Sequence, residues 1–563
     1  MASSGIAQAA GPASAPAKSA PAGSAPTGPA AGSAGADAIK KLPGKTFDSP
    51  ADRTVTSPVP GEQAGQAAPA QGDTGTRKLS AVIGVGLHAT AASAHGIDLE
   101  TKLFPTDTSN LAVTIAWGDG TTSTFNTTVG GGGNDTRVTK HKYATVGVFD
   151  IKVTAKEASQ GVQGSNQVTV GTLGAEFTPH TPTRVLDTRS GVGAAAAKVG
   201  ARSTVALKID GAAQIPVGAY AVVLNVTVTN ADGPGHISVQ PTKSSAENAT
   251  TSNLNFTAGQ TVPNLVVATV GNDGYVYLFN AGWQSVDLLA DVTGYFTPQT
   301  ASGYKSVTQS RVVDTRSGLG TAQGPVAGQS GFDVAIAGRN GVPYGVTAVA
   351  LNLTVTNPQD AGHLTAYPSG QAAPTTSSVN FTAGQTVANA VIVPVSADGK
   401  VSIRNGSWHP ADVVLDVVGY YTPTSRSALV PVGVPVRLLD TRVPDGNRPA
   451  APVPARGYFV LGLEGDTTTP EVDGWVLNTT VTNTKGPGFL SVDPDPNYWS
   501  NYQNGNAVVP NRPVSSTLNW TAGATVPNVA QTSGGKGGIV DFWNQGWEDA
   551  DLLVDLLGYY ESN

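Results

Sequence analysis

Three aspartate–arginine pairs are the side chains whose type and spacing most directly suggest chemistry. In each pair the two residues lie two positions apart: Asp187 and Arg189, Asp314 and Arg316, Asp440 and Arg442. In a β-strand this spacing places both side chains on one face, where a guanidinium can bind a carboxylate through two parallel hydrogen bonds. Each pair could be a structural brace, or a charged clamp for a polyanion, a sugar or a partner chain. We expect the brace, because a structural element is repeated for the same reason as the core.

Three tryptophan-bearing turns are stronger candidates for ligand contact. Trp283, Trp408 and Trp547 occupy equivalent short turns, each just before a strand that ends in Gly-Tyr. An indole ring at a loop tip offers a flat apolar face and an N–H donor, which suits contact with a glycan or a protein.

A longer loop in the third copy adds further aromatic residues. It spans 25 residues from Pro494 to Asn519, against 14 and 12 in the equivalent segments, and holds Tyr498, Trp499 and Tyr502 among Asn, Asp and Ser. This composition predicts either a contact surface for glycan or protein, or a self-packed cap on the last copy.

Catalytic and metal-binding patterns are weak in this chain. Aspartates recur four apart (Asp287 and Asp291, Asp412 and Asp416, Asp551 and Asp555), which could suggest calcium or a glycosidase pair, although a role in closing each sandwich is expected. There is no His-Glu-x-x-His, no Gly-x-Ser-x-Gly and no phosphate-binding Gly-rich loop. His236 and His363 align with Phe489, so that position need not titrate. We therefore expect no enzyme activity, no cofactor and no bound metal, calcium being possible but not indicated.

The elements that position these residues form a long repeat. Arg-x-x-Asp-Thr-Arg begins at Arg184, Arg311 and Arg437, 127 and 126 residues apart, and each block ends on Gly-Tyr. Matching sequence motifs at a nearly constant spacing indicate tandem duplication of a whole domain. Within each copy, alternating apolar and hydroxyl residues predict short strands, such as Leu224 to Asn230, and no long helical period occurs. Equivalent asparagines, Asn264, Asn389 and Asn528 among them, could bind sugar hydroxyls or satisfy backbone groups; the latter is expected.

The repeated motifs resemble those of a sequence repeat found in secreted and surface proteins of actinobacteria. The resemblance rests on Leu-Asp-Thr-Arg, Leu-Asn-x-Thr-Val-Thr-Asn, Asn-Phe-Thr-Ala-Gly-Gln-Thr-Val and the final Gly-Tyr-Tyr, and it covers residues 184 to 560. It implies an exported, envelope-facing protein and no particular biochemical activity. The composition is also similar to that of bacterial S-layer proteins.

The segment before the repeats resembles a PKD domain, an immunoglobulin-like sandwich. Trp117-Gly-Asp-Gly120 matches the Gly-Asp-Gly turn of that family, and His141-x-Tyr143 with Gly147 matches the strand that follows. The resemblance implies a spacer or contact module without catalytic residues. The first 77 residues are rich in Ala, Pro, Gly and Ser, with Phe47 as their only aromatic residue, and we predict a disordered tether.

The composition of the chain limits the classes of partner that we expect it to bind. Charged residues make up 13% of the chain and the net charge is −7, without a Lys/Arg cluster, so nucleic acid is an unexpected partner. Cysteine is absent, Met1 is the only methionine, and no apolar run is long enough to span a membrane. Met1 is followed by Ala-Ser-Ser-Gly, which suggests a mature chain with an added start codon after removal of a signal peptide.

These observations predict an all-β protein: an Ig-like (PKD) sandwich followed by three tandem homologous β-sandwiches, in an extended or pseudo-threefold array. The predicted boundaries are 1–77 (tail), 78–172 (PKD-like domain), and 173–298, 299–424 and 425–563 (repeats 1, 2 and 3). The predicted function is that of a secreted, non-enzymatic structural protein that assembles into or scaffolds a surface array. Its partners would be copies of itself, other envelope proteins or cell-wall glycan. The alternative is an adhesin or lectin-like module for cell-wall or extracellular glycans, and a third, weaker one is the accessory region of a secreted hydrolase.

Overall fold

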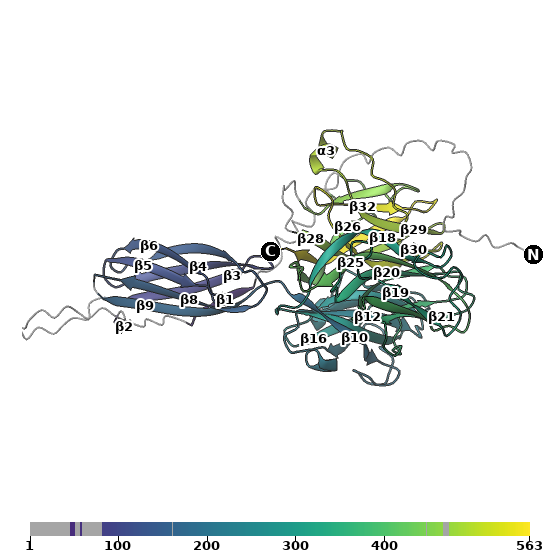
Figure 1. Cartoon of the computed structure of the whole chain (residues 1–563), viewed down its shortest axis with the longest axis horizontal. Helices are drawn as coiled ribbons and strands as arrows, with labels where there is room; N and C mark the ends of the chain where they lie inside the picture. The colour runs from purple at the N-terminus through teal and green to yellow at the C-terminus, as the bar shows by residue number, and fades with distance from the viewer. Residues whose placement is uncertain are drawn as a thin grey trace, which may run out of the picture. The chain divides into compact units, whose positions relative to one another are not determined.

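Figure 1 shows the computed structural model of the chain, which describes residues 45–50, 57–58, 82–159, 161–445, 448–464 and 472–562. Antiparallel strands make up nearly all of its regular structure, so the prediction of an all-β chain built from sandwiches is confirmed. None of the described helices has the length and apolar character needed to cross a membrane. The chain divides into two compact units, one formed mainly by residues 43–175 and one by residues 176–297 and 301–562.

The N-terminal unit is a sandwich of two antiparallel sheets. In spatial order, the first contains β1 (Thr46–Asp48), β3 (Ile83–Ala91), β4 (Gly96–Pro105) and β7 (Asp135–Lys142), and the second contains β2 (Ser57–Pro58), β9 (Val162–Gly171), β8 (Val148–Glu157), β5 (Ser109–Ala116) and β6 (Thr122–Val129). Its core includes Trp117 and Tyr143, both fully buried. The Tyr143 hydroxyl donates to the Trp117 carbonyl oxygen at 2.9 Å, which links the two motifs singled out in the sequence.

Two strands of this sandwich come from the segment predicted to be a disordered tail. Phe47 in β1 pairs with Ala89 of β3, and its half-buried ring packs against the core. β2 pairs with β9 at Ser57 and Pro58. The prediction was therefore wrong at these strands, because a single aromatic side chain and a neighbouring sheet edge suffice to order a short segment. The rest of the predicted tail, apart from Lys45, Ser49 and Pro50, lies outside the described residues.

Each of the three repeats contains two four-stranded antiparallel sheets with the same strand order. The inner sheets are β10 (Glu176–Asp187), β17 (Asp287–Thr297), β12 (Ala221–Thr229) and β15 (Val262–Thr269) in repeat 1; β18 (Gly303–Asp314), β25 (Asp412–Thr422), β20 (Ala348–Thr356) and β23 (Val387–Pro394) in repeat 2; and β26 (Ala428–Asp440), β33 (Asp551–Glu561), β28 (Val472–Thr482) and β31 (Val526–Thr532) in repeat 3.

The outer sheets are β11 (Ser203–Lys208), β16 (Tyr275–Asn280), β13 (Gly235–Gln240) and β14 (Leu254–Phe256) in repeat 1; β19 (Gly331–Ala335), β24 (Lys400–Asn405), β21 (Gly362–Pro368) and β22 (Val379–Phe381) in repeat 2; and β27 (Tyr458–Gly462), β32 (Ile539–Asn544), β29 (Gly488–Pro494) and β30 (Leu518–Trp520) in repeat 3. Helical segments within the described residues are η1 (Ala212–Gln214), α2 (Lys243–Glu247) and α3 (Trp499–Gln503). Branched apolar side chains fill the space between the two sheets of repeats 1 and 2.

The three repeats form one compact body because their inner sheets meet at β15, β23 and β31. Asn389 donates to Asn225 Oδ1 at 3.0 Å, Asn528 to Asn352 Oδ1 at 3.2 Å, and Asn264 to Asn478 Oδ1 at 3.3 Å. The contacts thus run between repeats 1 and 2, 2 and 3, and 3 and 1. Equivalent faces that join in this cyclic manner close into a ring with approximate threefold symmetry.

An aromatic cluster fills one end of the ring, and we call it the hub. It contains the equivalent residues Phe296, Tyr421 and Tyr560 together with their cross-strand neighbours Phe177 and Tyr304, all fully buried. The Tyr421 and Tyr560 hydroxyls lie 2.5 Å apart, and the buried Gln531 amide donates to them at 3.2 and 3.0 Å. The hub therefore carries polar groups that belong to repeats 2 and 3 only.

Candidate functional site

The aspartate–arginine pairs form salt bridges within each repeat. Arg189 donates from Nε to Asp187 Oδ1 at 2.9 Å and from Nη2 to Asp187 Oδ2 at 2.7 Å. The same two bonds join Arg316 to Asp314, at 2.9 and 2.7 Å, and Arg442 to Asp440, at 2.8 and 2.6 Å. The bidentate geometry is that of the predicted brace.

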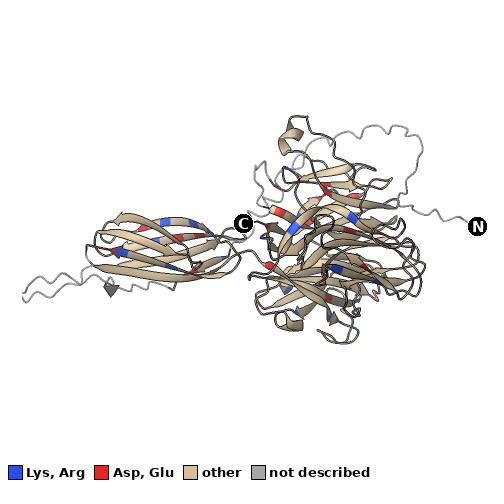
Figure 2. Ribbon diagram, in the orientation of Figure 1, with Lys and Arg blue, Asp and Glu red and all other residues tan. Residues whose placement is uncertain are grey.

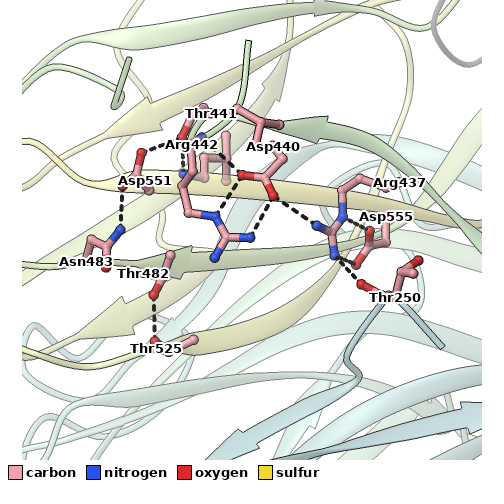
Figure 3. A network of polar contacts seen from close by, with 12 residues as sticks. Thr250, Arg437, Asp440, Thr441, Arg442, Thr482, Asn483, Thr525, Asp551 and Asp555 are labelled. Carbon is pink, nitrogen blue, oxygen red and sulfur yellow. Dashed lines mark hydrogen bonds and ion pairs between the residues drawn. The ribbon is translucent and has the colours of Figure 1, made fainter. Parts of the chain in front are cut away.

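A second arginine completes each brace and was not predicted as a member. Figure 3 shows the network of repeat 3, in which Arg437 contacts Asp440 and also Asp555, one of the aspartates spaced four apart. The other aspartate of that pair, Asp551, accepts from the Thr441 hydroxyl at 2.7 Å and from the Asn483 amide at 2.7 Å. The paired aspartates therefore tie neighbouring strands together, as expected. The sequence signal for the second arginine was its fixed place three residues before the brace aspartate.

The two carboxylates that contact the brace arginines of repeat 1, Asp187 and Asp291, have pKa values shifted in opposite directions. The hydrogen bonds from Arg189 lower the pKa of Asp187 to about 2, so this carboxylate stays charged. Burial raises the pKa of Asp291, and hydrogen bonds from Arg184 offset part of this effect. Within the described residues, no group of three or more His, Cys, Asp or Glu side chains is arranged to hold a metal ion. The brace charges are satisfied internally, which leaves them little capacity for a ligand.

The three tryptophan turns present their rings to solvent. Trp283, Trp408 and Trp547 are 78%, 81% and 79% exposed. In each copy the turn joins an outer strand to an inner strand, so threefold symmetry places all three at one end of the ring. The hub lies at the other end of the same inner strands, because Phe296, Tyr421 and Tyr560 are near their last residues.

A buried asparagine at the end of each outer strand fixes the turn, and the sequence analysis missed it. Asn280 Nδ2 donates to the carbonyl oxygens of Val199 and Gln284 at 3.2 and 2.8 Å, while Oδ1 accepts from the Gly282 amide at 3.0 Å. Asn405 and Asn544 make the equivalent bonds. Their signal was the fixed spacing of three residues between asparagine and tryptophan in every copy. The indoles are therefore carried by rigid turns.

The aromatic loop of repeat 3 folds back on its own domain. Trp499 in α3 is buried against Val460 and Ile539, and Tyr502 packs beside it. The Tyr502 hydroxyl donates to Asp495 at 2.5 Å. Trp499 therefore cannot offer its ring to a ligand, and we correct this prediction: its placement is that of the self-packed cap. Of the three aromatic residues only Tyr498 is exposed.

Beneath α3 lies an acidic cluster that sequence reasoning did not identify. Asp541 and Asp495 are fully buried, and Asp493 lies nearby. Burial, followed by repulsion from Asp495, raises the pKa of Asp541 to about 10, and burial raises that of Asp493 to about 6. Tyr502 of α3 donates to Asp495, so the cluster lies under the cap and does not face a substrate.

The remaining candidates are structural. Asn225, Asn264 and their equivalents line the ring contacts described above, as expected for backbone-satisfying groups; Asn264, for instance, donates to the Asn253 carbonyl oxygen at 2.6 Å. Burial lowers the pKa of His236 and of His363, so both imidazoles are held neutral.

Comparison with known proteins leaves the chain without a family. No family model and no curated protein match it. Similar solved structures include the M60 catalytic domain with two CBM51 domains of Clostridium perfringens ZmpB (9% identity, covering 88% of this chain and 56% of that chain, TM-score 0.13). A second is a triple jelly roll protein from the turret of an archaeal virus (8%, 69% and 91%, TM-score 0.14), and a third is a tetra-tandem repeat from the extending region of a large adhesion protein (13%, 83% and 96%, TM-score 0.13). The chain thus spans about half the length of the first structure. Scores this low carry no argument about function.

Proposed function

We propose that the chain is a non-enzymatic, exported adhesin-like protein that binds glycans on cell walls or extracellular surfaces through its three tryptophan turns. One observation carries the proposal: three strongly exposed indoles occupy equivalent rigid turns at one end of a closed ring. The PKD-like N-terminal unit would act as a spacer.

The turns are suited to binding because they are ordered before a ligand arrives. Each indole is held by an asparagine whose amide is fully used by the backbone of the turn. Covering an exposed indole removes roughly 150–250 Å² of surface from water, worth about 4–6 kcal/mol before the entropic cost of association. With little loop entropy to lose, more of this energy is available for affinity.

Glycan is the ligand class that best fits the surroundings. Along the ribbon of the repeats, Figure 2 shows few charged residues, with Lys and Arg interspersed among Asp and Glu. A sparse, mixed surface offers no electrostatic footprint for nucleic acid. Flat indoles among neutral hydroxyl and amide groups can instead stack on the apolar faces of sugar rings. Three such contacts on one repetitive polysaccharide would add by avidity.

The ring also bears on the surface-array hypothesis. The faces that join repeat to repeat are already occupied inside one molecule, where the contacts close after three copies. A lattice of an S-layer kind would have to use surfaces outside these ring contacts. The glycan-binding alternative is therefore the function that the geometry supports better.

Substitution of the three tryptophans tests the proposal. We expect each single Trp→Ala variant to lower retention on insoluble cell-wall polysaccharide about tenfold, and the triple variant to abolish it, since avidity typically multiplies affinity by about 10²–10⁴. Tyr344→Ala is the matched control, because Tyr344 is 84% exposed but lies in the loop between β19 and β20, at the hub end of the outer sheet. Undiminished retention of a folded triple variant would contradict the proposal.

A further inference from the structure

The outward faces of the three outer sheets are equivalent in backbone but differ in what covers them. In repeat 1, Tyr277 and Phe279 point outward from β16, and α2 lies over them with Ala246 buried against both rings. The Lys243–Glu247 helix begins at Thr242, which caps it by accepting from the Ser245 amide at 3.1 Å. This face is closed.

In repeat 3 the same face is closed by α3. Cross-strand register makes Asp541 and Trp543 of β32 the equivalents of Tyr277 and Phe279. Trp543 stacks on Tyr458 with ring centroids 4.3 Å apart, and Arg512 lies over Trp543 at 5.5 Å. Trp499 is buried beside them.

In repeat 2 the face is open. The connection between β21 and β22 is the shortest of the three and contains no helix, although every one of its residues is described. Ser402 and Arg404 take the places of Tyr277 and Phe279. The result is a solvent-accessible hollow of about 340 Å³, within the size range of small-ligand sites.

The lining of the hollow combines donors, acceptors and one ring. Arg404 donates to Gln329 Oε1 at 2.9 Å, and Ser402 donates to Asp333 Oδ1 at 2.5 Å. Tyr367 contributes an aromatic face. Among the described residues Arg404 has no carboxylate within ion-pair distance, so most of its donors are open to a ligand. Because the Asp333 carboxylate shares the space, a neutral polyhydroxylated ligand fits better than an anion.

The hollow continues into the Trp408 turn through Gln329. The Gln329 amide donates to the carbonyl oxygens of Gly406 and Ser407 at 2.7 and 3.0 Å, immediately before Trp408. In repeats 1 and 3 this position is an arginine, whose guanidinium lies over the indole: Arg202 is 5.7 Å from Trp283, and Arg456 is 5.0 Å from Trp547. No cation lies over the Trp408 ring within the described part of the chain. Its face is available beside an open site.

We propose that the outer face of repeat 2 is a sugar-binding site that takes one neutral sugar residue of a glycan chain, with the next residue stacked on Trp408. Vicinal hydroxyls would donate to Asp333 and accept from Arg404, a pairing that a single hydroxyl or a phosphate does not reproduce. The inference rests on the proposed glycan-binding function and assigns its specificity to one copy.

Substitutions borrowed from the closed copies test the site with little risk to folding. Ser402→Tyr together with Arg404→Phe gives repeat 2 the outward residues of repeat 1, and Arg404→Ala removes the cation alone. The full-length chain is titrated with soluble neutral cell-wall oligosaccharides, and its retention on the corresponding insoluble polysaccharide is measured in parallel. We expect one bound oligosaccharide per chain and at least a tenfold loss of affinity in both variants. Tyr344→Ala, which alters an exposed ring outside both proposed sites, should leave the soluble affinity and the retention unchanged.

The two measurements separate the proposals. If both the Ser402→Tyr, Arg404→Phe variant and the Arg404→Ala variant bind soluble oligosaccharide with wild-type affinity, the repeat 2 site is overturned and the proposal for the tryptophan turns is unaffected. Loss of soluble binding in the Ser402 and Arg404 variants, with normal retention of a Trp283→Ala, Trp547→Ala double variant, supports the repeat 2 site and overturns a contribution from the other two turns. Absence of wild-type binding to every neutral glycan tested overturns both.

Discussion

The polar trio in the hub makes a quantitative prediction about stability. Gln531 occupies the place of Val267 in repeat 1 and Ile392 in repeat 2, and it donates to the hydroxyls of Tyr421 and Tyr560. Burial raises the pKa of both tyrosines, so both hydroxyl protons are present at neutral pH. Gln531→Ile gives repeat 3 the residue that repeat 2 has at this place and removes two buried hydrogen bonds. At about 0.5–1.5 kcal/mol each, the expected loss is about 1–3 kcal/mol.

Removing the two tyrosine hydroxyls instead of the glutamine should lower the free energy of unfolding by a similar amount. Tyr421→Phe with Tyr560→Phe leaves the Gln531 amide buried without its two acceptors, a penalty of about 1–3 kcal/mol. Combining all three substitutions removes donors and acceptors together and leaves an apolar hub like that around Phe296. The triple variant should therefore lie within about 1 kcal/mol of the wild type, since replacing both partners by apolar groups of similar shape can be nearly neutral.

Urea and thermal unfolding of the wild type and the three variants measure this coupling. The free energies should be strongly non-additive, with the triple variant more stable than either parent. A triple variant that loses the sum of the two separate losses would refute the reasoning, because the three side chains would then act independently. The control is Trp408→Ala, which alters an exposed ring at the end of the inner strands away from the hub.

Two further predictions concern buried carboxylates. Asp187→Asn should lower the free energy of unfolding by about 1–3 kcal/mol at pH 7, because it removes a charged acceptor from Arg184 and Arg189. The pKa of Asp187 is about 2 in the folded protein and about 3.9 in the unfolded chain. The stabilisation by the carboxylate is therefore present above pH 4 and is lost as the pH falls towards 2. Urea midpoints at pH 7 and pH 2 check it, and an equal difference at both pH values would contradict it. Asp541→Asn should raise the melting temperature more at pH 8 than at pH 5, because the folded pKa of Asp541, about 10, makes the wild type lose stability as the pH rises above 4. Melting curves of both proteins at the two pH values test this, and a pH-independent difference would exclude it.

Local pattern was sufficient to predict the strands and the brace. Alternation of apolar and hydroxyl residues depends only on the two faces of a strand, and it identified the segment Leu224 to Asn230, most of which lies in β12 (Ala221–Thr229), without knowledge of its partners. The contact between Asp187 and Arg189 forms as predicted, although Arg189 lies in the turn after β10 and not in the strand that the prediction assumed. The exposure of Trp283 likewise follows from its place in a short polar turn.

Features that depend on distant partners could not be predicted. Asn389 reaches Asn225, which belongs to another repeat, and nothing in either segment distinguishes a ring contact from a turn contact. Phe47 was indistinguishable from an isolated aromatic residue until its strand was paired with β3. Trp499 lies in a polar segment typical of an exposed loop, but the apolar side chains that bury it come from β27 and β32.

Closure of the ring explains why the repeats differ where they do. The inner sheets carry the brace, the asparagine contacts and the hub, so a change there disturbs two repeats at once. The outer sheets touch neighbouring repeats at β14, β22 and β30, but their outward faces lie away from these contacts and can vary independently. α2 covers one such face, α3 covers another, and the third has a hollow lined by Ser402 and Arg404. The threefold symmetry thus gives the chain three equivalent tryptophan turns, whereas the differences between the outer sheets leave a hollow in repeat 2. A soluble oligosaccharide should consequently bind once per chain, whereas retention on a polysaccharide surface should depend on three turns.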